Sequence, residues 1–140
     1  MGLNAVVYRN AARLAADYGG EKVDCDPQTG EALLSQTKKW GVPEDAIVAC
    51  KQRLGNVAET LFLREEVEKV LDHMDSLLLR RVLYSASHSG DIIEAGDFPR
   101  LIEEIGLLKN HGEARLIAFI EAMESLLLAA KAENNPIVFV

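Results

Sequence analysis

Two short apolar segments at opposite ends of the 140-residue chain constrain its fold more than any other feature. Residues 3–8 read Leu-Asn-Ala-Val-Val-Tyr, and residues 137–140 read Ile-Val-Phe-Val after a proline. Short runs rich in β-branched residues and bounded by breakers are typical of strands. A lone strand would leave its backbone N–H and C=O groups without partners. We therefore expect the two ends of the chain to pair with each other or to share a small sheet.

Amphipathic helices are predicted for most of the remaining chain. The clearest lies between Glu113 and Asn134, and another begins at Asp97 and Pro99 and ends at residues 110–112. Glu103 and Glu104 are expected off the apolar face of the latter. Asn56, followed by Glu59, matches the start of a capped helix. The apolar positions that define these helices are Leu116, Phe119, Ile120, Met123, Leu127 and Ala130; Leu101, Ile102, Ile105 and Leu108; and Val57, Leu61, Val67, Val70 and Leu71.

The segments between these helices give weaker signals. Pro43 suits a first helical turn and Gly55 a helix end, which predicts a helix over residues 43–55. Residues 31–34 are predicted as a short strand and residues 38–43 as a connection. Periodicity does not separate helix from strand over residues 77–84, where we favour helix. The fold expected is a single α+β domain over residues 1–140, predominantly helical, with four to five helices packed on a small sheet that includes both terminal strands.

The charge balance bounds the kind of partner. Fifteen basic and 22 acidic residues give a net charge of −7, which repels nucleic acid and anionic membranes and attracts a basic protein. The basic pairs Lys38-Lys39 and Arg80-Arg81 are expected to be solvated surface. No apolar run approaches the ~20 residues of a membrane span. No secretion signal opens the sequence, so we expect a cytoplasmic protein with reduced Cys25 and Cys50.

One polar loop gathers residue types that are used in catalysis. Residues 84–91 read Tyr-Ser-Ala-Ser-His-Ser-Gly-Asp, with hydroxyls, an imidazole and a carboxylate close together. Catalytic triads, however, are assembled from distant segments, and the loop lacks the glycine pattern of a nucleophile elbow. The chain also lacks zinc-ligand spacing and a phosphate-binding loop. We expect no catalytic residue, metal ligand or cofactor, and interpret the loop as structural or partner-binding.

The candidate partner-binding residues are this loop, the acidic residues that follow it and the single tryptophan. Trp40 would be an interface anchor if it is exposed, and a core residue is the equal alternative. The candidates are Tyr84, Ser87, His88, Ser89, Asp91, Glu94, Asp97 and Trp40.

Four segments together resemble a family of small, uncharacterised bacterial proteins of about this length. They are the opening Met1-Gly2-Leu3-Asn4-Ala5-Val6-Val7-Tyr8, the central Arg53-Leu54-Gly55-Asn56, the loop Leu83-Tyr84-Ser85-Ala86-Ser87-His88-Ser89-Gly90-Asp91, and the ending Pro136-Ile137-Val138-Phe139. The resemblance implies no established activity. By small size and acidic balance, such proteins are similar to immunity proteins that neutralise bacterial toxins.

The leading hypothesis is a non-enzymatic binding protein, monomeric or dimeric, of the type that inhibits a toxin domain with a basic surface by direct contact. One alternative is a small hydrolase or transferase that uses His88 with Ser87, Ser89 or Asp91. Another is a homo-oligomeric structural protein, which would expose a large apolar face on its monomer.

Overall fold

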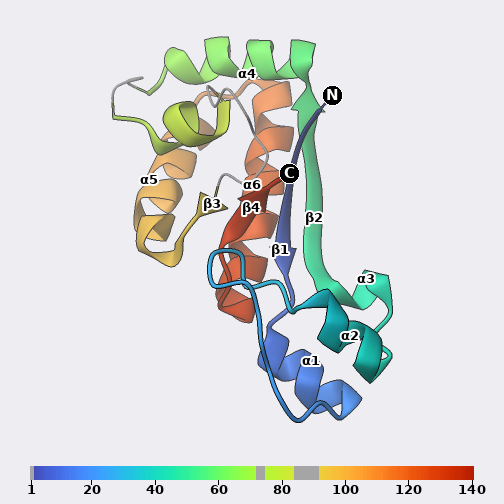
Figure 1. The fold of residues 1–140 in the computed structure, drawn as a ribbon. Helices are drawn as coiled ribbons and strands as arrows, with labels where there is room; N and C mark the ends of the chain where they lie inside the picture. Colours follow the sequence, from blue (N-terminus) through green and yellow to red (C-terminus); the bar gives the residue numbers. More distant parts are fainter. Residues whose placement is uncertain (1, 72–74, 84–91) are drawn as a thin grey trace.

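The structure is a computed structural model, and it describes residues 2–71, 75–83 and 92–140. The fold is α+β and predominantly helical, as the sequence predicts (Figure 1). Helices and strands alternate irregularly along the chain. In order they are β1 (Gly2–Tyr8), α1 (Ala11–Tyr18), α2 (Leu34–Trp40), α3 (Glu44–Ile47), β2 (Val48–Asn56), α4 (Val57–Glu68), the π-helix η1 (Leu78–Leu83), β3 (Ile92–Ile93), the 3₁₀ helix η2 (Ala95–Asp97), α5 (Phe98–Lys109), α6 (Ala114–Glu133) and β4 (Ile137–Phe139).

The two ends of the chain pair, which confirms the expectation from the terminal segments. The sheet has the order β2-β1-β4-β3, and each neighbouring pair is antiparallel. Ala5 lies opposite Phe139, and Val6 lies opposite Val138. The C-terminal strand is therefore an interior strand, held between β1 and β3 rather than added at an edge.

Alternation along the strands places the core on one face of the sheet. Leu3, Ala5 and Val7 of β1, with Ile137 and Phe139 of β4, belong to the main hydrophobic core, whereas Val138 is buried outside that cluster. Helix α6 packs against β1, β2 and β4, and α4 crosses the end of the sheet where β2 finishes (Figure 1). The predicted apolar stripe of α6, from Leu116 to Ala130, is buried.

The helix predicted over residues 43–55 is wrong. Only α3 is helical there, and Val48–Asn56 forms β2, which runs antiparallel to the full length of β1. Pro43 does begin a helical turn, but Gly55 lies in the sheet opposite Leu3 rather than at a helix end. The physical reason is long-range pairing, because β2 satisfies the backbone groups of β1 that β4 leaves open.

Two predictions near the N-terminus are also wrong. Residues 31–34 do not form a strand, since only Ala32 makes a bridge, with Cys25. Residues 38–43 are not simply a connection, because α2 continues to Trp40 before Gly41 ends it in a left-handed conformation. Lys38 and Lys39 in the last turn complement the helix dipole. Helix α2 thereby helps to close a second, smaller core formed by Ala11, Leu14 and Ala32, with Trp40 and Val42 packed against it.

The predicted start of α4 is confirmed. The Asn56 side chain accepts the Glu59 N–H at 2.8 Å, and the Glu59 carboxylate accepts the Asn56 N–H at 3.3 Å. The predicted apolar face is correct in part. Val67 and Leu71 are buried and Val70 packs against the core, but Val57 and Leu61 are exposed, and Thr60 and Leu63 are buried instead. The preference for helix over residues 77–83 is confirmed by η1. Within the described residues, no helix combines the length and apolar character needed to cross a bilayer.

Candidate functional site

The polar loop singled out from the sequence, residues 84–91, lies outside the part of the chain that the structure describes. Tyr84, Ser87, His88, Ser89 and Asp91 lie outside the described residues. Glu94 follows β3 as an exposed residue before η2. It lines a hollow of about 330 Å³ together with Phe98 and Lys131, among others. Of the predicted partner-binding residues, Glu94, Asp97 and Trp40 lie within the described part of the chain.

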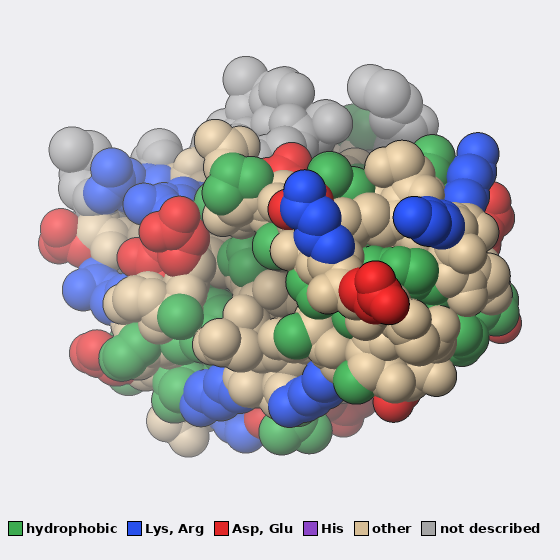
Figure 2. All heavy atoms as spheres, turned by 60° about the horizontal axis from the view of Figure 1, so that its bottom comes forward, with side chains coloured by type: hydrophobic (Ala, Val, Ile, Leu, Met, Phe, Trp, Pro, Cys, Tyr) green, Lys and Arg blue, Asp and Glu red, His purple; other side chains and the backbone are tan. Residues whose placement is uncertain are grey.

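Asp97 has its charge engaged within the molecule. The residue stands at the position before α5, as expected, but its side chain makes no capping hydrogen bond to the helix. Its carboxylate instead pairs with the Arg81 guanidinium of η1 at 3.0 Å. On the face shown in Figure 2, acidic and basic side chains are interspersed rather than gathered by sign. The net charge of −7 is therefore not concentrated in one acidic area on that face.

Trp40 contributes to packing more than to an open surface. It is half-buried at the end of α2 and packs on the small core of Ala11, Leu14 and Ala32. Its indole lies directly against Gly20, where a Cβ would collide with the ring. Of the two readings left open by the sequence, the structure favours a core role for Trp40.

An apolar groove lies between α5 and α6. Its volume is about 500 Å³. Two large side chains stand exposed at it: Leu128, with 73% of its surface accessible, and Ile102, with 44%. The groove is lined by Ile102, Ile105, Gly106, Lys109, Glu124, Ser125, Leu127, Leu128 and Lys131.

Charged and small residues shape the groove. The Lys109 ammonium of α5 pairs with the Glu124 carboxylate of α6 at 3.0 Å, which ties the two walls together. Gly106 lies within α5, and a Cβ built on it would meet nothing within 4 Å. Alanine would therefore fit at this position and would favour the helix, so the glycine keeps the groove wider at a cost in helix propensity.

A buried carboxylate anchors the far side of α5. Glu104 is 2% exposed, which corrects the expectation that it lies off the buried face. It accepts hydrogen bonds from the Ser76 hydroxyl at 2.7 Å and from the backbone N–H groups of Leu77 and Leu78 at 2.9 and 3.1 Å. Arg100 adds an ion pair at 3.1 Å. The carboxylate thus caps the start of the helical segment that leads into η1 and fixes α5 against it.

A second carboxylate fixes the turn between α5 and α6. Glu66 of α4 lies 2.7 Å from the Lys69 ammonium and 2.8 Å from the His111 imidazole, which belongs to that turn. Hydrogen bonds from Lys69 and then His111 hold the pKa of Glu66 below its ordinary value. Both α5 and the α5–α6 turn are therefore held from outside the groove, and the groove walls are preorganised.

The groove was missed by the sequence, although one signal was present. Residues 126–128 are three consecutive leucines, and a helix that packs on one side cannot bury all three. Leu126 and Leu127 are buried and Leu128 is exposed. Ile102, which was expected on the buried face of α5, is the second exposed residue, whereas Leu101 and Ile105 are buried.

No group of three or more His, Cys, Asp or Glu side chains in the described ranges is arranged to hold a metal ion. Comparison with known proteins found no matching family model, no matching curated protein and no matching solved structure.

Proposed function

We propose that this chain is a non-enzymatic binding protein of the immunity type, which neutralises a bacterial toxin domain by direct contact. The observation that supports this most is the α5–α6 groove, with Leu128 and Ile102 exposed on a rigid pair of helices. Exposed apolar side chains that gather beside a groove with a polar rim are typical of protein interfaces.

The groove suits an apolar anchor from the partner. Leu127, 8% exposed, and Ile105, 4% exposed, provide a buried apolar floor, and Lys109, Glu124 and Lys131 supply the polar rim. Anchor residues that enter such pockets dominate binding free energies, while the charged rim excludes water and fixes orientation. A helix or loop of the toxin domain that presents a large apolar side chain would fit this arrangement.

Net charge supports the choice of partner class. A chain at −7 attracts a basic domain at long range and speeds its encounter. The exposed Glu94 beside the 330 Å³ hollow is one acidic residue available for this role. The sequence resemblance to small bacterial proteins of immunity-like size and charge points to the same class of function.

Co-expression tests the proposal. The domain encoded beside this gene is expressed in a sensitive host with the wild-type chain, with Leu128→Glu, or with Val57→Glu, which places the same charge at an equally exposed residue on α4. We expect wild type and Val57→Glu to restore growth and Leu128→Glu to fail, with all three chains equally abundant. If the neighbouring domain is not toxic, or if Leu128→Glu protects as well as wild type, the proposal is wrong.

The same exposed residues also favour a second candidate, self-association. Two copies could cover Leu128 and Ile102 by packing their α5–α6 faces together. Light scattering separates the two candidates, because a single chain has a mass of 15.4 kDa. A dimer that Leu128→Glu converts to a monomer would assign the groove to self-association, whereas a wild-type monomer leaves it open for a partner.

A further inference from the structure

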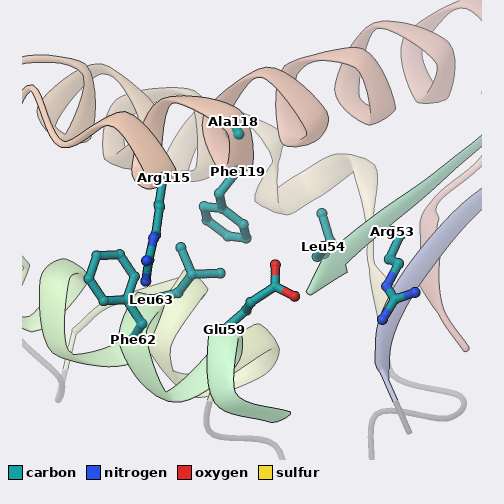
Figure 3. Close-up of a pocket in the computed structure, with 8 residues that line it drawn as sticks. All are labelled: Arg53, Leu54, Glu59, Phe62, Leu63, Arg115, Ala118 and Phe119. Atoms are coloured by element: carbon teal, nitrogen blue, oxygen red, sulfur yellow. The ribbon is translucent and has the colours of Figure 1, made fainter. Parts of the chain in front are cut away.

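A further hollow, which shares no lining residue with the α5–α6 groove, lies where β2 ends and where α4 and α6 begin. Its volume is about 450 Å³. Three buried side chains form an apolar floor: Leu54 from β2, Leu63 from α4 and Phe119 from α6. Phe62, Ala118, Glu59, Arg53 and Arg115 complete the lining (Figure 3). A volume of this size and a mainly apolar lining with a few polar groups are typical of small-ligand sites.

The two arginines that line this cavity, Arg53 and Arg115, have no carboxylate partner among the described residues. Arg9, Arg13, Arg81 and Arg100 each lie within 4.0 Å of a carboxylate oxygen. Arg53 and Arg115, by contrast, make no ion pair with any residue in the described part of the chain. Arg80 also forms no ion pair with a described residue, but only Arg53 and Arg115 line the same cavity, where their exposed charges are available to an anion.

Arg115, the arginine on α6, packs against an aromatic ring. The Arg115 guanidinium carbon lies 4.7 Å from the centre of the Phe62 ring, a cation–π contact that restricts the side chain without neutralising it. Figure 3 shows Arg115 beside Phe62 at one side of the cavity and Arg53 at the other, with the Glu59 carboxylate between them in this view. One oxygen of Glu59 is already used to accept the Asn56 N–H.

We infer that this cavity binds a carboxylate joined to an apolar, ring-bearing body. The carboxylate would pair with Arg115, whose planar guanidinium suits bidentate recognition, and Arg53 would add attraction from the opposite side. The ring would lie on Phe119, Leu54 and Leu63. This site uses none of the residues of the α5–α6 groove, so the inference is independent of the proposed function. Such a ligand has two sources: a free small acid, or the C-terminal residue of a polypeptide.

Titration with defined probes tests the site. The intact protein is titrated with 3-phenylpropionate, with its neutral amide 3-phenylpropanamide, and with the tripeptide Gly-Gly-Phe carrying either a free or an amidated C-terminus, and binding is followed by NMR. We expect saturable shifts with the two acids and none with the two amides. Stronger binding of the tripeptide acid assigns the site to a polypeptide C-terminus, and binding of phenylpropionate alone assigns it to a free acid. No saturation with either acid, or equal binding of acid and amide, overturns the inference.

Variants tie the signal to the cavity. Arg115→Gln should weaken binding of the acid by about tenfold or more, because a charge-assisted contact is lost. Arg80→Gln, an exposed arginine of η1 outside the cavity, is the matched control and should leave the affinity unchanged. Glu59→Gln keeps the capping pattern and removes a like charge, so it should strengthen binding. Equal losses in Arg115→Gln and Arg80→Gln, or weaker binding in Glu59→Gln, would contradict the inferred site.

Discussion

Removing the buried carboxylate of Glu104 should remove a large part of the free energy that stabilises the folded chain. Glu104 accepts two backbone N–H groups, from Leu77 and Leu78, and the Ser76 hydroxyl, all at 2.7–3.1 Å. In Glu104→Ala, both N–H groups lose their acceptor in a buried place, at about 1–3 kcal/mol each. The Arg100 pair adds little, because that guanidinium side chain is 50% exposed. We therefore expect a loss of about 3–5 kcal/mol of unfolding free energy.

Urea denaturation followed by circular dichroism measures this loss, and the chain supplies its own control. Glu103 is the adjacent residue of the same type on α5, but it is exposed, so Glu103→Ala should change the unfolding free energy by less than about 0.5 kcal/mol. Ser76→Ala should cost about 1–2 kcal/mol, since Ser76 also accepts the Leu79 N–H. The double variant of Ser76 and Glu104 should lose less than the sum of the single losses. Equal midpoints for Glu103→Ala and Glu104→Ala would refute the reasoning.

Three further predictions concern α5, the C-terminal strand and the acid side of the stability curve. Gly106→Ala should raise the unfolding free energy by about 0.5–1 kcal/mol, since its Cβ meets nothing within 4 Å, and a lower urea midpoint would contradict this. Deleting residues 136–140 removes Ile137, Val138 and Phe139, each at most 3% exposed and worth about 1.5–3 kcal/mol, so cooperative thermal unfolding should be lost. Deletion of the exposed Val140 alone should be tolerated. An unchanged melting temperature of the longer truncation would refute the role of the strand. The pKa of Glu66 is lowered in the folded chain, so its contribution to stability is present above its ordinary pKa of 4.5 and is lost as pH falls through the folded value. The melting temperature of wild type should therefore drop more steeply on acidification than that of Glu66→Gln. Parallel curves would show that the contacts to Lys69 and His111 add nothing to stability.

Much of the fold could be predicted where a local sequence pattern is strong or where backbone groups must find hydrogen-bond partners. The terminal segments had to find partners for their backbone groups, and they found each other at Ala5–Phe139 and Val6–Val138. The stripe from Leu116 to Ala130 is continuous enough to define α6 by itself. The capping pattern of Asn56 and Glu59 is contained within four residues, so no distant contact was needed to recognise it.

Strand β2 could not be predicted from local pattern because its reason lies elsewhere in the chain. Residues 43–55 carry weak helix signals at Pro43 and Gly55, but residues 48–56 are extended because β1 offers them a full-length partner. Glu104 was missed for the same kind of reason. A glutamate on a helix is expected in solvent, and only the packing of α5 against the start of η1 brings unpaired N–H groups to it.

The candidate site shows the same division between local and long-range information. The sequence directed attention to the loop around His88, whose residues 84–91 lie outside the described chain, and to Asp97, whose carboxylate pairs with Arg81. Neither the α5–α6 groove nor the cavity between Arg53 and Arg115 has a sequence motif, because each is made by side chains from separate elements. Only the run of three leucines at 126–128 indicated in advance that α6 would leave an apolar residue exposed.

The most direct test of the proposed function is the affinity of the domain encoded beside this gene for the purified chain, measured by isothermal titration with wild type, Leu128→Glu and Val57→Glu. Leu128 and Val57 are both large apolar residues with strongly exposed surfaces, 73% and 64% accessible, but only Leu128 lines the groove. We expect Leu128→Glu to weaken binding by about thirtyfold or more, as the loss of an interface anchor does, and Val57→Glu to bind as wild type does. Equal affinities for all three chains, or no binding by the wild type, would contradict the proposal.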